Sequence, residues 1–366
     1  MMELKADLER CWEKGLPFAA FSLPSERNIH LWVQADDRNS EIQAGFLMHP
    51  FSSHGRSQAV WIQADGQRNI KQNPEFSAWL KALPSFSRPF SLPPPEMNAA
   101  THQALVGETV AQIQAGTFEK AIISRPKLVA IPENWSLMDY FFTLQATYPK
   151  AHVALVYHPQ VGIWIGASPE ILLTGTEQHY ETVALAGTRR WNQGKLDQPW
   201  RSKELDEQKI VADYLFNRLE DLGAKHMKHE GPKTIQAGQL AHLKTQFSFE
   251  FAGDPLRIAE ELHPTPAVSG FPKAAAIEYL ELKEPYDRSY YAGFMGPITG
   301  EKTHLWVNLR CMQVFDSQLA IYVGGGITAA SNPGEEWEET EWKSRTLLTV
   351  LEHMPKLDLK LPHDFR

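Results

Sequence analysis

The chain has 366 residues, of which 43% are hydrophobic, so it is long enough to bury a large core in one domain or two. Its formal net charge of −8 argues against a nucleic-acid-binding surface, which would be basic, although a local group of cations could still bind a small anion. The two cysteines, Cys11 and Cys311, are far apart and lack metal-ligand spacing, which is typical of a protein from a reducing compartment.

The N-terminus is charged and lacks the apolar segment of a secretory signal, and the sequence has no apolar run of about 18 residues. We therefore expect a cytoplasmic protein that binds no nucleic acid and does not enter a membrane.

Short apolar strands separated by polar turns are predicted at 17–23, 29–34, 44–51 and 59–65. Residues 84–97 contain five prolines, which predicts a linker or an extended crossing segment. We therefore divide the chain into residues 1–97, a strand-rich part of the same fold, and residues 98–366, which hold the candidate site.

Longer elements are predicted after the proline-rich segment. Apolar residues at helical spacing predict helices at 102–116, 202–223, 274–282 and 334–353. Apolar runs predict strands at 120–125, 153–158, 161–167, 171–176, 181–186, 290–298, 304–314 and 319–323. Strands joined by hairpin-like turns, with the helices in blocks, favour an α+β fold over alternating βαβ units.

The segment 322–343 is the most informative part of the sequence. An apolar strand leads into Gly324, Gly325 and Gly326, and Asn332 followed by proline is typical of a helix start. Glycines allow a ligand to approach backbone N–H groups, and the glutamates that follow offer the oxygen ligands that Mg2+ prefers. The alternative is a solvated helix face, since acidic residues in a first turn also complement the helix dipole.

Two pairs of glutamates have the same spacing. Glu204 and Glu207 lie three residues apart on one predicted helix, and Glu336 and Glu339 repeat this spacing on the last one, so each pair shares a helix face. Two such faces could hold one divalent cation, and Mg2+ usually takes one or two carboxylates together with water and substrate oxygen. The alternative is that all four glutamates are surface charges.

Four single residues are further candidates for chemistry. Lys120 shares a strand face with Ile122. If that face is buried, desolvation would lower the pKa of the lysine and make it a possible general base. The alternative is an exposed lysine at a strand entry. Glu170 follows a turn, where burial would raise the pKa of a carboxyl and make it a general acid, unless it is an ordinary turn residue. Arg310 could bind a ligand carboxylate or form a structural ion pair, and His263 could orient a ligand or only pack.

Taken together and in this order, these segments resemble the chorismate-utilising enzymes, which include isochorismate, salicylate, anthranilate and aminodeoxychorismate synthases. The resemblance covers residues 100–353 or so and rests on spaced motifs: Lys120-Ala-Ile-Ile-Ser-Arg, Gly166-Ala-Ser-Pro-Glu170, Ala186-Gly-Thr-Arg-Arg190, Lys203-Glu-Leu-Asp-Glu207, the loop 263–272, Arg310-Cys, and Gly324-Gly-Gly-Ile with Glu336-x-x-Glu339. It implies two large, mostly antiparallel sheets packed together with helices outside.

The resemblance also implies the ligands of the site. Glu207 and Glu339 would bind Mg2+ together with a carboxylate of chorismate, and Glu204 and Glu336 would support them. The other residues that would hold the substrate are Gly187, Thr188, His263, Ala267, Arg310, Lys343 and the backbone of Gly324–Gly326.

Two positions separate the members of the family. The base position is lysine in members that add water, and it is Lys120 in this chain; Ala267 stands where aminodeoxychorismate synthases commonly carry a nucleophilic lysine and salicylate synthases tend to carry a threonine. The match therefore implies an isomerase that converts chorismate to isochorismate: Lys120 takes a proton from the water that attacks carbon 2, and Glu170 protonates the hydroxyl that leaves carbon 4.

The alternatives are a salicylate synthase, which would then eliminate pyruvate, and a non-catalytic chorismate-binding protein. The resemblance favours a monomer, and no amidotransferase subunit is expected, because ammonia is not the nucleophile if Lys120 is the base. The product would serve menaquinone or siderophore biosynthesis.

Overall fold

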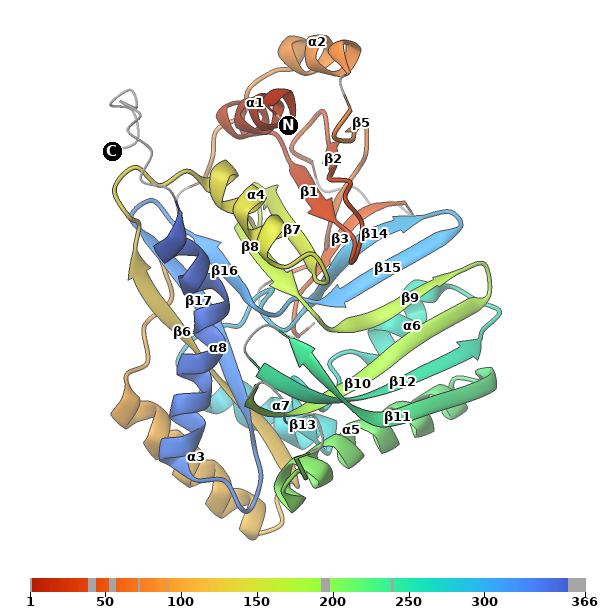
Figure 1. Cartoon of the computed structure of the whole chain (residues 1–366), viewed down its shortest axis with the longest axis vertical. Helices are drawn as coiled ribbons and strands as arrows, with labels where there is room; N and C mark the ends of the chain where they lie inside the picture. The colour runs from red at the N-terminus through yellow and green to blue at the C-terminus, as the bar shows by residue number, and fades with distance from the viewer. Residues whose placement is uncertain are drawn as a thin grey trace.

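The structure is a computed structural model that describes residues 2–38, 44–52, 57–71, 73–89, 91–191, 198–237 and 240–354. Within these residues the strands form two antiparallel sheets, of nine and eight strands, with helices on the outside (Figure 1). This arrangement confirms the predicted α+β fold of two packed sheets.

The order of the strands is as follows. From one edge to the other, the nine-stranded sheet contains β13 (Gly270–Phe271), β6 (Lys120–Ala130), β17 (Gln318–Ile327), β16 (Cys311–Val314), β8 (Gly162–Ser168), β7 (His152–His158), β1 (Phe18–Ser22), β2 (His30–Val33) and β5 (Gly66–Arg68). The eight-stranded sheet contains β11 (Lys225–Ala237), β12 (Leu240–Glu250), β10 (His179–Arg190), β9 (Ile171–Thr176), β15 (Lys302–Val307), β14 (Phe294–Thr299), β3 (Gly45–His49) and β4 (Val60–Ile62).

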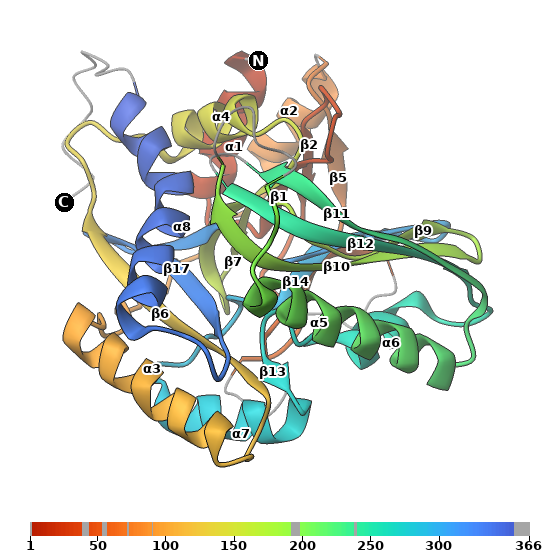
Figure 2. The same ribbon diagram turned by 60° about the horizontal axis from the view of Figure 1, so that its bottom comes forward.

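The helices are α1 (Met2–Glu13), α2 (Pro74–Ala82), α3 (Ala99–Gln114), α4 (Leu137–Thr147), α5 (Ser202–Asp221), α6 (Pro255–Leu262), α7 (Lys273–Lys283) and α8 (Pro333–His353). Figure 2 shows α5 running along β10 and β12, while α3 and α7 lie against β6. Helix α8 packs on β17 and also contacts α3 and α4. Among the described helices, none has both the length and the apolar character that crossing a membrane requires.

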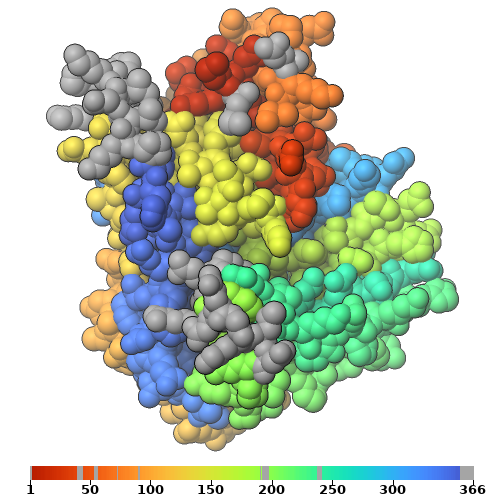
Figure 3. All heavy atoms as spheres, in the orientation of Figure 1, coloured from red at the N-terminus to blue at the C-terminus, as the bar shows by residue number. Residues whose placement is uncertain are grey.

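Residues 1–97 contribute strands to both sheets. β1 lies between β2 and β7 in one sheet, and β3 pairs with β14 in the other. In the space-filling view, the surface of these residues (red and orange) is continuous with that of α4 (yellow) (Figure 3). The described residues of the proline-rich stretch 84–97 form neither helix nor strand.

Strand β1 shows how the core is divided. Its side chains alternate between the two faces of the sheet, as the pleat requires. Ala19 and Phe21 belong to the apolar cluster between the two sheets, whereas Phe18 and Ala20 belong to a second cluster beneath α1, α4 and α8. The nine-stranded sheet is therefore buried on both faces.

Two predicted helix starts can be compared with the structure. α8 begins as predicted, because the side chain of Asn332 accepts hydrogen bonds from the backbone N–H groups of Gly334 (2.9 Å) and Glu335 (3.2 Å). α3 begins at Ala99, three residues before the predicted start, because Asn98 caps it in the same way through Thr101 N (2.9 Å).

The predicted strands at 290–298 and 304–314 were wrong in extent. β14 begins only at Phe294, after Ala292 with a φ of 58°. The other strand is divided into β15 and β16 by a turn in which Arg310 has a φ of 49°. A side chain in this left-handed region interrupts the extended conformation, and it gives Arg310 a direction that a regular strand would not.

We expect Phe46→Ala to lower the free energy of unfolding by about 3–5 kcal/mol. Phe46 of β3 is fully buried between the sheets, with its ring centroid 5.1 Å from that of Phe21 in β1, so truncation leaves a cavity between strands of both sheets. Urea unfolding measures the change, with the exposed Phe216→Ala as control. A loss as small as that of the control would contradict a core shared by the two sheets.

Candidate active site

A cavity with an empty volume of about 710 Å3 lies where strands of both sheets meet α5 and α8. Its walls include ten of the residues predicted from the sequence: Glu170, Gly187, Thr188, Glu207, Ala267, Arg310, Gly324, Gly325, Gly326 and Lys343. Its lining combines apolar side chains with a few convergent charged groups, which is typical of a small-molecule site. The cavity thus brings together segments that range from Ile122 to Lys343 in the sequence.

A larger and more open hollow of about 1540 Å3 lies on the outer surface, against α5, the end of α6 and the start of α7. Its charged side chains are largely paired with one another: Lys209 donates to Asp213, and Arg218 donates to Glu261. It contains none of the predicted acid, base or glycine residues, so we assign the chemistry to the smaller cavity.

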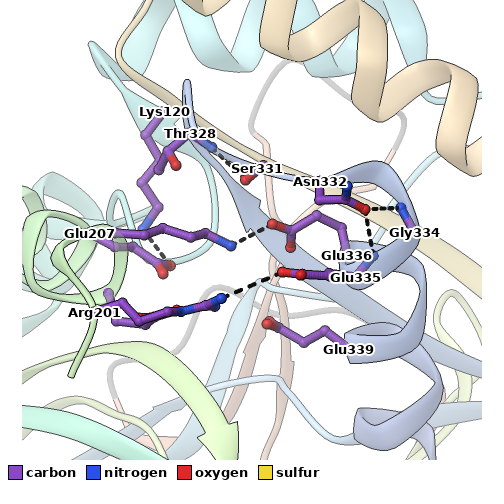
Figure 4. Close-up of polar contacts among 12 residues, drawn as sticks. Lys120, Arg201, Glu207, Thr328, Ser331, Asn332, Gly334, Glu335, Glu336 and Glu339 are labelled. Atoms are coloured by element: carbon purple, nitrogen blue, oxygen red, sulfur yellow. Dashed lines mark hydrogen bonds and ion pairs between the residues drawn. The ribbon is translucent and has the colours of Figure 1, made fainter. Parts of the chain in front are cut away.

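The three glycines at the end of β17 leave room for carboxylates. A Cβ atom on Gly326 would lie 2.3 Å from Glu207 Oε1, and one on Gly325 would lie 3.3 Å from Glu336 Oε2 and 3.6 Å from Glu339 Oε1. Figure 4 shows these three carboxylates pointing toward the same space from α5 and α8. Glu207 of the first predicted pair therefore faces Glu336 and Glu339 of the second across the glycine backbone.

Each of the four predicted carboxylates has a cation beside it. The pairs are Glu204 with Arg201 (2.6 Å), Glu207 with Lys120 (3.1 Å), Glu336 with Lys203 (2.5 Å) and Glu339 with Lys343 (2.7 Å). Within the described residues, no three acidic, histidine or cysteine side chains are gathered tightly enough to form a ready-made metal cage.

Other features of these carboxylates suit a hard cation. Glu336 is almost fully buried, and its Oε2 forms no hydrogen bond of good geometry with the described residues. Burial, and then the charge of Glu339, raise the pKa of Glu336. The oxygen donors and the glycine cradle fit Mg2+, which needs only one or two carboxylates and completes its shell with water and substrate oxygen.

Lys120 opens β6 and is fully buried, which excludes the alternative of an exposed lysine at a strand entry. Its Nζ lies 3.1 Å from Glu207 Oε1 but makes no hydrogen bond of good geometry within the described part of the chain. Burial alone would raise the pKa of Glu207, but the ammonium groups of Lys120, Lys203 and Lys343 lower it below its ordinary value. Glu207 is therefore an anion beside the lysine.

Glu170 lies in the turn between β8 and β9 and is buried. Burial raises the pKa of its carboxyl from 4.5 to about 8, although the charges of Lys120, Lys343 and Arg310 oppose the shift. The carboxyl is therefore protonated at neutral pH and can donate a proton into the cavity.

Arg310 meets a histidine that the sequence analysis did not single out. The Arg310 guanidinium donates to Thr346 Oγ1 (3.0 Å), and its other terminal nitrogen lies 3.5 Å from His242 Nε2. Burial, then the charges of Arg310 and Lys343, lower the pKa of His242 to about 3, so the ring is neutral. Its Nδ1, 3.1 Å from Gly187 O, then carries the proton, which leaves Nε2 to accept from Arg310.

This arrangement has two consequences. No carboxylate of the described chain forms an ion pair with Arg310, so its guanidinium can take one from a ligand. His242 in turn ties Arg310 to the bulge of β10, where Gly187 has a φ of 67°. The sequence signal that could have identified His242 was its place as a polar residue between Ala241 and Leu243, in a strand that faces inward.

The structure does not bring His263 to the cavity. Its ring is buried against Phe294 (centroids 4.9 Å apart) and His49 (5.9 Å), and it is not among the residues that line the cavity. His263 was expected either to orient a ligand or only to pack, and its position fits packing.

The chain resembles known proteins along most of its length. A family model described as chorismate binding enzyme matches residues 57–352. The chain is 30% identical over 282 residues to the isochorismate synthase EntC of Escherichia coli, which covers 72% of this chain and 71% of that protein.

Solved structures share the fold. The 2,3-dihydroxybenzoate-specific isochorismate synthase DhbC from Bacillus anthracis matches with a TM-score of 0.75 and 21% identity, over 95% of this chain and 99% of that one. The menaquinone-specific isochorismate synthase MenF from Escherichia coli matches with a TM-score of 0.75 and 17% identity, over 93% and 89%.

We expect Glu170→Gln to become more stable relative to the wild type as the pH rises from about 5 to 8. In the unfolded chain the carboxyl ionises near 4.5, whereas the folded protein keeps the proton up to about 8, so the wild type loses stability over this interval. Glutamine does not titrate, and the difference should grow by about 1.4 kcal/mol per pH unit at most.

Urea unfolding at several pH values measures this difference. Glu338→Gln, on the exposed face of α8, is the control and should show no such trend. A Glu170→Gln difference that is constant with pH would mean that the carboxyl is ionised in the folded protein.

Proposed function

Because this chain belongs to the family of chorismate-binding enzymes, we propose that it is an isochorismate synthase, an isomerase that moves a hydroxyl from carbon 4 of chorismate to carbon 2. The observation that carries the proposal is a neutral buried acid, Glu170, at a cavity that also presents Arg310 and Lys343, with the buried Lys120 behind its wall, 3.1 Å from the cavity-lining Glu207. A dianionic substrate would find both an acid–base pair and two cations there.

The reaction needs one proton removed and one supplied. Lys120 acts as the base and takes a proton from the water whose oxygen forms the new bond to carbon 2. The ring double bonds shift, the bond between carbon 4 and its oxygen breaks, and Glu170 gives its proton to that oxygen, which leaves as water. One water is added and one is lost, so the product is an isomer, and in the reverse direction the two residues exchange roles.

The substrate would be held through its carboxylates. Arg310 offers a fork of two donors that matches a carboxylate, and Lys343 offers a point charge next to Gly324, whose carbonyl accepts from its Nζ (2.7 Å). The backbone of Gly324–Gly326 allows close approach, and Thr188, Ala267 and the bulge at Gly187 complete the wall.

We further propose Mg2+ as the cofactor, held by Glu207 and Glu339 with support from Glu204 and Glu336. When bound, it supplies positive charge against a carboxylate of the substrate. The buried and unpaired Oε2 of Glu336 and the convergence of carboxylates on Gly325 and Gly326 support this assignment.

The main rival function is that of a salicylate synthase, which would also release pyruvate. Ala267 at the cavity wall favours the isomerase, because the resemblance places a threonine there in salicylate synthases. The test is incubation with chorismate and Mg2+, followed by chromatography of the products. Isochorismate alone is expected, whereas salicylate with pyruvate would overturn the assignment.

We expect Lys120→Gln and Glu170→Gln each to lower kcat by about 100- to 10,000-fold, the usual contribution of a general base or acid. Both substitutions keep the size and polarity of the side chain, so chorismate should still bind. Steady-state rates and a separate binding measurement check this. Full turnover by either variant would assign its role to another group, and chorismate binding without turnover by the wild type would favour a non-catalytic protein.

Chelation by EDTA should abolish the activity, and added Mg2+ should restore it. Glu339→Gln is expected to weaken Mg2+ binding, measured by calorimetry on the protein without substrate, because an amide lacks the charge of a carboxylate. Glu335→Gln, on the exposed part of the same helix turn, is the matched control. Equal binding by both variants would remove Glu339 from the ligand set.

We also propose that the enzyme acts in the cytoplasm as a monomer without an amidotransferase subunit. Two buried free thiols, Cys11 and Cys311, support a reducing compartment, and water as nucleophile needs no ammonia source. A mass measurement in solution tests the monomer. We propose menaquinone or siderophore biosynthesis as the use of the product, and the matching structures include one menaquinone-specific and one 2,3-dihydroxybenzoate-specific isochorismate synthase.

A further inference from the structure

The first half of β6 has only a very short neighbour at its outer edge. β13 pairs with Lys120 and Ala121, and Ser269 O then accepts a hydrogen bond from Ile122 N (2.9 Å). Beyond that point the carbonyl of Ile122 and the N–H of Ser124 face an edge that no strand among the described residues covers. Buried backbone groups need partners, so other groups must satisfy them.

A buried ion pair takes the place of the missing strand. Ser124 N donates to Glu284 Oε1 (2.8 Å), and Arg288 Nη2 donates to Ile122 O (2.5 Å). The two side chains join each other through Nε to Oε2 (2.6 Å) and Nη2 to Oε1 (2.7 Å). Both lie in the connection from α7 to β14, and their side chains are only 2% and 3% exposed.

The same guanidinium also holds a second segment that lines the cavity. Arg288 Nη1 donates to the carbonyl of Val268 (2.8 Å) in the loop between α6 and β13. Val268 and Ile122 both line the cavity, whereas Arg288 and Glu284 do not. One side chain outside the cavity thus links two neighbouring segments that line it.

The strand that is held in this way carries the proposed base. Lys120 lies two residues before Ile122, on the same face of β6, and its Nζ is 3.1 Å from Glu207 Oε1. Ser124 fits closely against the glycines, since a Cβ on Gly324 would be 3.0 Å from the Ser124 Cβ. A shift of β6 would therefore move Lys120 relative to the glycines and the carboxylates.

We infer that Glu284 and Arg288 are positioning residues, which set the place of Lys120 by completing the edge of β6. The inference rests on the proposed function, because that function makes Lys120 the base. Arginine suits the task because its rigid fork serves three acceptors at once, Glu284, Ile122 and Val268, and a lysine ammonium cannot reproduce this geometry.

The test is Arg288→Lys, which keeps the charge and removes the fork. A displacement of about 1 Å at a reacting group can cost about 100-fold in rate, so we expect kcat to fall by that order. The KM for chorismate should stay close to that of the wild type, because Arg310 and Lys343 lie on other elements. Both constants are measured below the unfolding temperature, with the folded fraction determined by circular dichroism.

A second buried arginine pair provides a matched control. Arg68 of β5 pairs with Asp7 of α1, with side chains 1% and 2% exposed, and it also donates to the backbone carbonyls of Asn69 (3.2 Å) and Lys71 (2.8 Å). Arg68→Lys removes an equivalent fork in a part of the nine-stranded sheet remote from the cavity. It should lower the unfolding temperature and leave kcat unchanged.

Hydrogen exchange gives a readout that does not depend on turnover. Amide exchange in the peptide 118–126 should be faster in Arg288→Lys than in the wild type and in Arg68→Lys. Unchanged exchange in this peptide, or equal losses of kcat in the two lysine variants at equal folded fraction, would overturn the inference. If the wild type converts no chorismate, the proposed function fails, and the exchange of Ser124 still decides whether the ion pair holds β6.

Discussion

The candidate site depends on how closely the end of β17 approaches two helices. A side chain at Gly326 would begin 2.3 Å from a carboxylate oxygen of Glu207 on α5, and one at Gly325 would meet Glu336 of α8 at 3.3 Å. Only backbone can occupy this space while both helices keep their carboxylates turned toward the sheet. Three glycines therefore end a strand whose preceding residues are apolar. Their lack of side chains, which admits the carboxylates, also opens the cavity to a substrate.

Desolvation then gives neighbouring carboxyls different protonation states. Glu170 and Glu207 are both buried, and burial disfavours the anion in both. Glu207 has the ammonium of Lys120 3.1 Å away, with two more lysines near, and its pKa is lowered. No cation forms an ion pair with Glu170 within the described residues, and its pKa rises to about 8. One carboxyl is thus kept as an acid and the other as an anion, which is the division that the proposed acid–base catalysis beside a bound Mg2+ would use.

The α+β class and the paired glutamates could be predicted from the sequence because their signals are local, whereas the packing of two sheets and the other site residues were implied by the family resemblance. Asn332 with Pro333 and the glutamates three residues apart define a helix and its inward face without reference to the rest of the chain. The ladder of β11 and β12 was missed because 225–237 is rich in charged and histidine residues and is mostly exposed, so it lacks the apolar pattern of a buried strand. His242 was missed with it, since its role depends on contacts with Arg310 and Gly187, which are distant in sequence.

Similarity in sequence and similarity in fold do not cover the same part of this chain. The family model begins at residue 57, after β1, β2 and β3, yet the structural match with DhbC spans 95% of the chain. These three strands supply side chains such as Phe18, Phe21 and Phe46 to the two apolar clusters. A core accepts many apolar combinations of similar volume, so such strands can keep their place in a sheet while their residues change. Glycines that must admit a carboxylate, and an arginine that must serve three acceptors, have no such alternatives, and these lie within the part of the chain that the family model matches.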